Sequence, residues 1–339
     1  MMNWSACVSV ARVLAWAVAT VVAASAAYAQ TASPQNAEAV TWDSIVCRLG
    51  KCEPLKVRGY LFTQPGDKAV VILSHGSVGV DARIFERVDR LREVGIAALV
   101  PEHWASRGIG EVLGDLKGAP AKGASELNLA FDIYTAVAWL RSDRGFAKVG
   151  ALGASYGGGA QITVQQDWAR TVIEKTMAYH YKQPFVAKPL DAQVSMYGFC
   201  GYRNALRDRF DGTPILFING DRDEMTPAKL CEQLVPWMNE RGGNASMATL
   251  KGAYHAFDAR ERAAWVPKVK HMGKCDLVVD VGGTTNLTTG HLTADADFNV
   301  ALPKAVEECA TAWGYTSGNS GDPQIGQPVW LPFLKANLQ

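Results

Sequence analysis

The sequence predicts an α/β protein in which a mostly parallel central sheet is covered by helices on both faces. Short apolar runs alternate along the chain with segments of helical periodicity, and strands that are separated by helices form parallel sheets. Most of the runs are apolar at nearly every position, as is typical of strands buried on both faces. The chain has 339 residues, 48% of them hydrophobic, which is enough for one large domain.

The predicted elements follow one another in a regular order. Residues 57–63 have the pattern of a half-buried strand, and AVVILSH at residues 69–75 that of a strand buried on both faces. Apolar residues recur at helical spacing between Asp81 and the stop signal Gly95, which predicts a helix. The later strands are predicted at residues 96–101, 149–153, 193–199, 214–220 and 246–250, and the later helices at residues 125–141 and 227–239.

Two segments fit this alternation poorly. One covers residues 168–189, and the other, rich in Gly and Thr, covers residues 273–299. The chain contains no internal repeat, so a single domain over residues 45–339 with these two insertions explains the pattern better than two domains. Residues 30–44 are rich in Ala, Ser, Thr, Pro and Gln, and we predict that they form a flexible leader.

The first 29 residues differ in composition from the rest of the chain. Arg12 is their only charged residue, an apolar run begins at Val13, and the small residues Ala27 and Ala29 have the spacing of a cleavage site. This pattern predicts a secretory signal peptide that is cleaved after Ala29. A membrane anchor is the alternative, but the run is short and rich in Ala, whereas a membrane span needs about 20 strongly apolar residues. We therefore expect a periplasmic or secreted protein with no stable membrane anchor after cleavage.

The charges of the chain nearly balance. Lys and Arg total 34 and Asp and Glu total 33, so loss of Arg12 with the signal peptide leaves no formal net charge. No stripe of Lys and Arg is present, and nucleic-acid binding therefore has no electrostatic support.

Cysteine usage is consistent with export. Cys7 lies in the predicted signal peptide, and an even number of cysteines in an oxidising compartment suggests disulfides. Six cysteines allow fifteen connectivities, of which we expect pairing in sequence order. The expected pairs are Cys47–Cys52, Cys200–Cys231 and Cys275–Cys309. A zinc site is the alternative, but no C-x-x-C or Cys/His cluster has the spacing that such a site needs.

A glycine-rich segment, KVGALGASYGGGAQI, covers residues 148–162. Its glycines match neither the G-x-G-x-x-G of a dinucleotide loop nor the G-x-x-x-x-G-K of a P-loop. They do match G-x-S-x-G at Gly153, Ser155 and Gly157, between a predicted strand and a predicted helix. In a nucleophile elbow this motif presents a serine on a strained turn. A tight turn with an inert serine is the alternative interpretation.

A nucleophilic serine needs a base and an acid, which follow it in the order acid, then histidine, in proteins with this elbow. Asp223 stands beyond the tight turn after the strand at residues 214–220, and His255 follows the last predicted strand. Asp221 is the second candidate for the acid, although a turn residue more often bonds its own backbone. We predict Ser155, Asp223 and His255 as catalytic residues.

The transition state of acyl transfer also needs hydrogen-bond donors for its oxyanion. The loop SHGSVGV at residues 74–80 follows a buried strand, and its glycines allow backbone N–H groups to face inward. The predicted donors are the N–H groups of Tyr156 and Ser77, with Val78 as the alternative to Ser77. A plain strand-to-helix turn is the competing interpretation of this loop.

Together these segments resemble the dienelactone hydrolase family of α/β-hydrolases, and in particular its exported bacterial members. The resemblance covers roughly residues 57–258 and is carried by SHGSVGV, RG at residues 107–108, GASYGG, GDRDEMTPAKLC and GAYHAFD. It implies the α/β-hydrolase fold and hydrolase activity. Relatives of this type have cysteines placed similarly to Cys200 and Cys231, which supports that pairing.

The chain departs from dienelactone hydrolases proper at two points. Those enzymes have a cysteine at the elbow, where this chain has Ser155. They also have a glutamate near the oxyanion loop, and no glutamate lies within residues 74–80. Lactone specificity is therefore not carried over to this chain.

The sequence predicts an exported serine hydrolase that cleaves small carboxylic esters, or lactones or thioesters, without a metal or other cofactor. His103, Trp104 and Arg107 follow a predicted strand and are candidates for the substrate pocket, although Arg107 can equally form a structural ion pair. A serine peptidase, an acyltransferase and a non-catalytic binding protein on the same fold are alternatives. The elbow is also similar to that of prolyl-oligopeptidase-type peptidases, but the chain has no room for their propeller domain.

Overall fold

The structure, a computed structural model, describes residues 36–48, 50–113, 118–294, 298–310 and 312–339. The predicted signal peptide, residues 1–29, and residues 30–35 of the predicted leader lie outside the described residues. The chain from Glu38 to Gln339 forms one compact unit.

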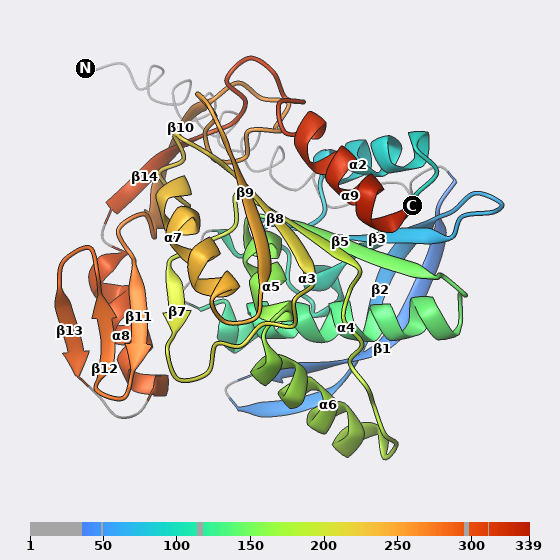
Figure 1. Ribbon diagram of the computed structural model, residues 1–339, viewed down its shortest axis with the longest axis horizontal. Coiled ribbons are helices and arrows are strands. Elements are labelled where there is room, and N and C mark those ends of the chain that lie inside the picture. Colours follow the sequence, from blue (N-terminus) through green and yellow to red (C-terminus); the bar gives the residue numbers. More distant parts are fainter. Residues whose placement is uncertain (1–35, 49, 114–117, 295–297, 311) are drawn as a thin grey trace, which may run out of the picture. The chain divides into compact units, whose positions relative to one another are not determined.

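Eight strands form the central sheet in the order β1-β2-β4-β3-β5-β6-β8-β9 (Figure 1). The six strands from β4 to β9 in this order are parallel to one another. At the other edge β1 pairs with β2, and β2 with β4, in antiparallel orientation. The predicted α/β-hydrolase fold with a mostly parallel sheet is thereby confirmed. The bounds are β1 (Glu38–Arg48), β2 (Lys51–Phe62), β3 (Ala69–Ser74), β4 (Ala97–Pro101), β5 (Lys148–Ala154), β6 (Ala192–Met196), β8 (Pro214–Gly220) and β9 (Asn244–Leu250).

Helices lie on both sides of this sheet, with α2 and α9 on one side of β3 and β5 and α4 on the other (Figure 1). Neighbouring residues of β5 show why. Ala151 joins an apolar cluster with residues of α4, whereas a Cβ atom at Gly150 would lie 2.9 Å from Leu338 of α9. The helices are α2 (Ala82–Glu93), α3 (His103–Ser106), α4 (Glu126–Ser142), α5 (Tyr156–Val164), α6 (Asp167–Tyr181), α7 (Ala228–Asn239), α8 (Phe298–Cys309) and α9 (Gln327–Leu338).

The two longest early helices begin at residues that cap them. The Asp81 side chain accepts a hydrogen bond from the Arg83 N–H at the start of α2, and the Ser125 hydroxyl accepts one from the Asn128 N–H at the start of α4. Such caps satisfy N–H groups that have no partner within the helix.

Strand β1 was not predicted from the sequence. Residues 38–44, which we assigned to the flexible leader, form most of this strand and pair with β2 in regular antiparallel register. Val40 and Trp42 are buried against α4 and the adjoining strands. Regular structure therefore begins at Glu38, inside the segment that we assigned to the leader.

Both predicted insertions contain regular structure. The first includes α6, and the second includes three strands that pair with β7 (Tyr202–Asn204) in the order β13-β12-β11-β7. A separate two-stranded sheet is formed by β10 (Ala264–His271) and β14 (Ala312–Ser317). The three strands of the second insertion are β11 (Leu277–Asp280), β12 (Gly283–Asn286) and β13 (His291–Ala294).

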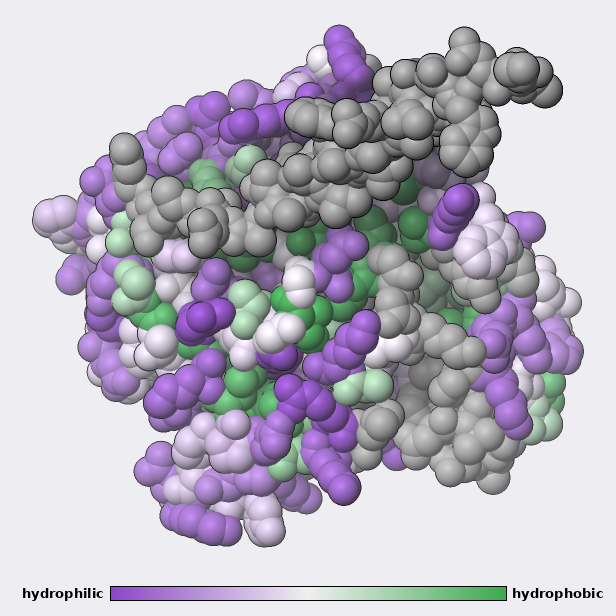
Figure 2. All heavy atoms as spheres, turned by 180° about the vertical axis from the view of Figure 1, so that it is seen from behind, coloured by the Kyte–Doolittle hydropathy of each residue, from purple (hydrophilic) through white to green (hydrophobic). Residues whose placement is uncertain are grey.

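Three disulfides join Cys47 to Cys52, Cys200 to Cys231 and Cys275 to Cys309. Such a number is typical of proteins from the periplasm or the cell exterior. In the part of the chain that the structure describes, no helix is long and apolar enough to cross a membrane. Hydrophilic residues predominate on the face shown in Figure 2, and hydrophobic residues gather near its centre.

Candidate active site

Ser155 lies on the turn between β5 and α5, with φ of 53° and ψ of −113°. A non-glycine residue with positive φ is strained, and such strain persists where the surroundings enforce it. Two glycines make the turn possible. A Cβ atom at Gly153 would lie 2.0 Å from the Gly157 carbonyl oxygen, and one at Gly157 would lie 2.5 Å from the Ser74 carbonyl oxygen. The G-x-S-x-G segment therefore has the geometry of a nucleophile elbow.

The structure brings Ser155, His255 and Asp223 together. The Ser155 Oγ lies 3.1 Å from His255 Nε2, and His255 Nδ1 lies 2.9 Å from Asp223 Oδ2. Both His255 and Asp223 are buried. The carboxylate can only accept, so we assign the imidazole proton to Nδ1. Nε2 is then available to accept the Ser155 hydroxyl proton.

The carboxylate of Asp223 is held by Thr226 as well as by His255. The Thr226 N–H donates to Oδ1 over 2.8 Å, and the Thr226 hydroxyl lies 2.8 Å from Oδ2 and 3.0 Å from the Tyr197 carbonyl oxygen. Sequence reasoning missed Thr226, although an aspartate in a turn often accepts from a backbone N–H a few residues later. Asp221, the second candidate for the acid, accepts from the Gly252 N–H, whereas His255 contacts Asp223.

The His255 ring lies between two tyrosine rings. Its centroid is 5.1 Å from that of Tyr197 and 5.5 Å from that of Tyr315, both edge to face. Tyr197 has φ of 37°, an unusual conformation for a bulky residue. Its hydroxyl donates to Asp258 over 2.7 Å and accepts from Arg87 over 3.0 Å. Sequence reasoning did not identify either tyrosine.

Arg87 and Asp258 form an ion pair beside the site. Burial alone would raise the pKa of Asp258, but the charges of Arg87 and Arg83 and hydrogen bonds from Arg87 and Tyr197 lower it below its ordinary value. The residue therefore carries a negative charge at neutral pH, which balances Arg87.

A cavity of about 130 Å³ opens beside Ser155 and His255. Its walls come from three parts of the chain. They are the loop at residues 74–80, which we call the oxyanion loop after its predicted role, two arginines of α2, and the β10–β14 sheet. The residues concerned are Gly76, Ser77, Val78, Gly79, Arg83, Arg87, Val266 and Tyr315. An apolar cavity of about 150 Å³ holds one benzene ring, so the space next to Ser155 suits a small group.

The predicted oxyanion donors border this site. A Cβ atom at Gly76 would lie 3.2 Å from the Cβ of Ser155, so the loop packs directly on the serine. The Ser77 carbonyl accepts hydrogen bonds from the N–H of Val112 and the indole of Trp104. Within the described residues, the N–H groups of Ser77 and Tyr156 donate no hydrogen bond. Val78 also lines the cavity.

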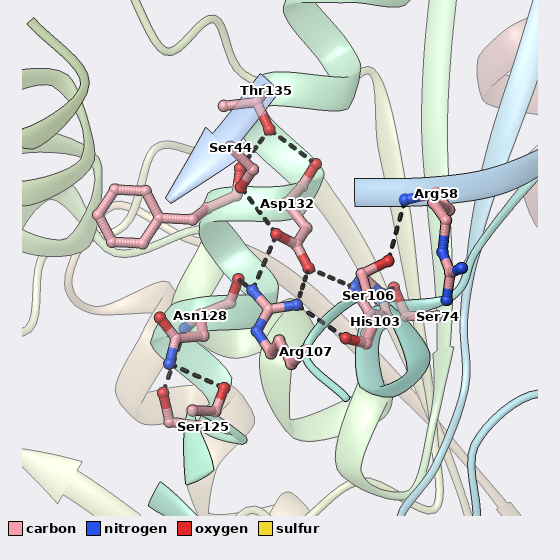
Figure 3. A network of polar contacts seen from close by, with 12 residues as sticks. Ser44, Arg58, Ser74, His103, Ser106, Arg107, Ser125, Asn128, Asp132 and Thr135 are labelled. Atoms are coloured by element: carbon pink, nitrogen blue, oxygen red, sulfur yellow. Dashed lines mark hydrogen bonds and ion pairs between the residues drawn. The ribbon is translucent and has the colours of Figure 1, made fainter. Parts of the chain in front are cut away.

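His103, Trp104 and Arg107 are not among the residues that line the cavity. All three are buried. Arg107 and His103 bind the Asp132 carboxylate (Figure 3). The structure therefore places these three residues behind the oxyanion loop and not in the substrate pocket where we expected them.

His75 also lines the cavity. Burial and the neighbouring His103 lower its pKa to about 3. It is therefore neutral at physiological pH. In the described part of the chain, no group of three or more His, Cys, Asp or Glu side chains is arranged to hold a metal ion.

The sequence profile of the dienelactone hydrolase family matches residues 57–276, which is more than half of the chain. No curated protein is significantly similar in sequence. Several solved structures are similar in fold. A dienelactone hydrolase from Anabaena variabilis is 19% identical, with a TM-score of 0.43 over 65% of this chain and 89% of that chain. Esterase 2 from Thermogutta terrifontis is 14% identical, with a TM-score of 0.49 over 67% of this chain and 87% of that chain. Est1E from Butyrivibrio proteoclasticus is 14% identical, with a TM-score of 0.40 over 63% of this chain and 90% of that chain.

Proposed function

Because the chain belongs to the dienelactone hydrolase family and is therefore an ester hydrolase, we propose that it cleaves small carboxylic esters through an acyl-enzyme on Ser155. The observation that carries this proposal is the series of contacts Ser155 Oγ–His255 Nε2 and His255 Nδ1–Asp223 Oδ2, at 3.1 and 2.9 Å, on a strained elbow. Lactones and thioesters undergo the same chemistry and remain within the proposal.

In the proposed mechanism His255 Nε2 takes the Ser155 hydroxyl proton as the Oγ attacks the ester carbonyl. The Asp223 carboxylate holds the imidazole in the required tautomer and stabilises the imidazolium that forms. The imidazolium then gives its proton to the leaving alkoxide, and the ester bond breaks. Water deprotonated by the same histidine hydrolyses the acyl-enzyme, which returns Ser155 to its starting state.

The oxyanion of each tetrahedral intermediate is proposed to accept hydrogen bonds from the N–H groups of Ser77 and Tyr156. A donor of this kind typically contributes about 3–4 kcal/mol to transition-state stabilisation. The position of Ser77 on the cavity wall supports this role. The reaction as written requires no metal or organic cofactor.

The size of the cavity supports short acyl groups. A cavity of about 130 Å³ accommodates an acetyl, propionyl or butyryl chain more readily than a long one. We also propose that residues 1–29 direct export and are removed after Ala29, which is consistent with three disulfides in the mature chain.

The test uses p-nitrophenyl esters from acetate to decanoate. We expect kcat/KM to be highest for the short esters and Ser155→Ala to lower kcat by at least about 10⁴-fold. Ser142→Ala is the matched control, because this exposed serine at the end of α4 contacts only its own helix and Asp143. Hydrolysis that survives in Ser155→Ala would refute the mechanism.

A fluorophosphonate probe gives an independent readout. We expect it to label the wild type and Ser142→Ala but not Ser155→Ala. A folded wild-type protein that the probe does not label would favour a binding protein, and transfer of the acyl group to an added alcohol in preference to water would favour an acyltransferase.

A further inference from the structure

A second series of a serine, a histidine and an aspartate lies beneath the oxyanion loop (Figure 3). The Ser74 Oγ is 3.2 Å from His103 Nε2, and His103 Nδ1 is 2.7 Å from Asp132 Oδ2. These three side chains are fully buried, at 0% exposure. No substrate can reach Ser74 in this arrangement, so the series cannot act as a nucleophilic site.

The charges fix the direction of each hydrogen bond. Burial alone would raise the pKa of Asp132, but the charge of Arg107 and hydrogen bonds from His103 and Arg107 lower it. Burial lowers the pKa of His103 in spite of the nearby carboxylate. A neutral His103 beside an ionised Asp132 must donate from Nδ1, so its Nε2 accepts from the Ser74 hydroxyl. Ser74 therefore has one preferred rotamer.

Arg107 fixes the same carboxylate from the other side. Its Nη1 and Nη2 donate to Asp132 Oδ2 and Oδ1 over 2.7 and 3.0 Å. The guanidinium also donates to the carbonyl oxygens of His103 and Asn128. A bidentate arginine–carboxylate pair has a defined geometry. The short helix α3, which contains His103, is thereby attached to α4, which contains Asp132.

Helix α3 contacts the oxyanion loop at two points. His103 accepts from the hydroxyl of Ser74 at the start of the loop, and the indole N–H of Trp104 donates to the carbonyl oxygen of Ser77 in its middle over 3.2 Å. The Trp104 ring also packs on His75 and Tyr156, with centroids 5.0 and 5.3 Å away.

The loop has little space to shift without disturbing the elbow. A Cβ atom at Gly157 would lie 2.5 and 2.7 Å from the carbonyl oxygens of Ser74 and His75. The loop backbone therefore packs on the first turn of α5. The peptide group between Gly76 and Ser77 carries the proposed oxyanion donor, so any movement of the loop changes where that N–H points.

We propose that Ser74, His103, Trp104, Arg107 and Asp132 are positioning residues that hold the oxyanion loop in its catalytic geometry. This inference rests on the proposed function, because it concerns the donor at Ser77. The network contacts no reacting atom, and its contribution appears in transition-state stabilisation and not in substrate binding.

The test is Ser74→Ala, which removes the hydroxyl that joins the network to the loop and leaves the Asp132–Arg107 pair intact. We expect kcat for a short p-nitrophenyl ester to fall about tenfold with KM changed less than twofold. Loss of a whole oxyanion donor costs about 10²–10³-fold, and a displaced donor costs less. The rate of Ser155 phosphonylation by a fluorophosphonate should fall by the same factor.

Thr213→Val is the matched control, because it also removes one buried hydroxyl, which donates to the Leu190 carbonyl at the far end of β8. It should lower the melting temperature about as much as Ser74→Ala and leave kcat unchanged. An equal fall in kcat for both variants, or a Ser74→Ala enzyme within twofold of the wild type, would overturn the proposal.

Trp104→Phe tests the contact with Ser77 and keeps the inference falsifiable if Ser74→Ala does not fold. It removes the indole N–H and keeps an aromatic ring, and the same pattern of lower kcat with unchanged KM is expected. Wild-type kinetics in Trp104→Phe would count against the proposal. If Ser155→Ala remains active, the proposed function fails; if Ser155→Ala is inactive and the loop variants behave as wild type, only this inference fails.

Discussion

Replacement of Asp258 by Asn isolates the energy of the ion pair that closes one side of the candidate site. Arg87 and Asp258 are 6% and 13% exposed in their side chains. Asp258 Oδ2 accepts from Arg87, and its Oδ1 accepts from the Tyr197 hydroxyl over 2.7 Å. The Arg87 guanidinium also donates to the Tyr197 hydroxyl oxygen. Asparagine keeps the size of the side chain and removes its charge.

Either orientation of the new amide loses a hydrogen bond. If its NH₂ faces Arg87, two donors meet; if it faces Tyr197, the phenol oxygen has two donors and its own proton has lost its acceptor. A lost hydrogen bond costs about 1 kcal/mol, and a buried pair broken by removal of one partner costs about 3–5 kcal/mol in total. Because the Arg87 side chain lines the cavity and is not fully enclosed by protein atoms, we expect a loss at the lower end of this range, about 3 kcal/mol.

Urea unfolding at pH 7, with the disulfides intact and tryptophan fluorescence as the signal, measures this loss of free energy of unfolding. The control is Asp43→Asn, since Asp43 pairs with Lys56 at an exposed site and such pairs contribute less than about 1 kcal/mol. A loss below about 1 kcal/mol for Asp258→Asn, with an unchanged denaturant slope, would refute the reasoning.

The same pair gives a pH dependence with a definite sign. The native pKa of Asp258 is lowered: burial opposes this shift, and Arg87 is its main cause. A lowered native pKa stabilises the fold above the ordinary aspartate pKa of about 3.9, and this stabilisation is lost as the pH falls through the native pKa. The difference in free energy of unfolding between the wild type and Asp258→Asn should therefore have its full value at pH 6–7 and a smaller value at pH 3. An equal difference at both pH values would contradict it.

Three further changes have defined outcomes. Gly157→Ala places a Cβ atom 2.5 Å from a backbone oxygen, and we expect soluble yield and melting temperature to fall and hydrolysis to be lost; normal activity would show that the elbow adapts. Thr226→Val removes the hydroxyl that supports the Asp223 carboxylate, and kcat should fall about tenfold with the fold intact, whereas an unchanged kcat would show that the backbone N–H suffices. Removal of the Cys200–Cys231 disulfide, which closes a loop of 31 residues, should cost about 3–4 kcal/mol in urea unfolding, and a cost below 1 kcal/mol would mean that the unfolded chain gains little freedom.

The fold class could be predicted from the sequence because the inner strands are apolar on both faces. The run at residues 69–75 shows this pattern, and all of β3 is buried. Strand β1 could not be predicted in the same way. Its first residues follow directly on a polar leader, and Trp42 is buried by α4, which lies about 90 positions further along the chain. Buried and exposed residues do alternate from Val40 to Asp43, but this signal is too short to separate the strand from the polar segment before it.

The sequence was enough to select the three candidate catalytic residues, but not the residues that surround them. Chain order and strand ends were enough to select Ser155, Asp223 and His255. The rule that residues after strand ends belong to the site also led us to predict Arg107 for the substrate pocket. That rule locates a residue along the chain but does not say which way its side chain points. The direction depends on the buried carboxylate of Asp132, which lies on another helix.

Helix α9 has a practical consequence for anyone who expresses this protein. The family match ends at residue 276, but Trp330, Leu334 and Leu338 of α9 are buried, and Leu338 packs where Gly150 lacks a side chain. Burial of three such side chains contributes about 5–8 kcal/mol, which is comparable with the whole stability of a typical domain. A fragment trimmed to the family boundaries would therefore expose the sheet and aggregate. Any affinity tag at the carboxyl end needs a spacer, because the Gln339 side chain donates to the Val94 carbonyl oxygen.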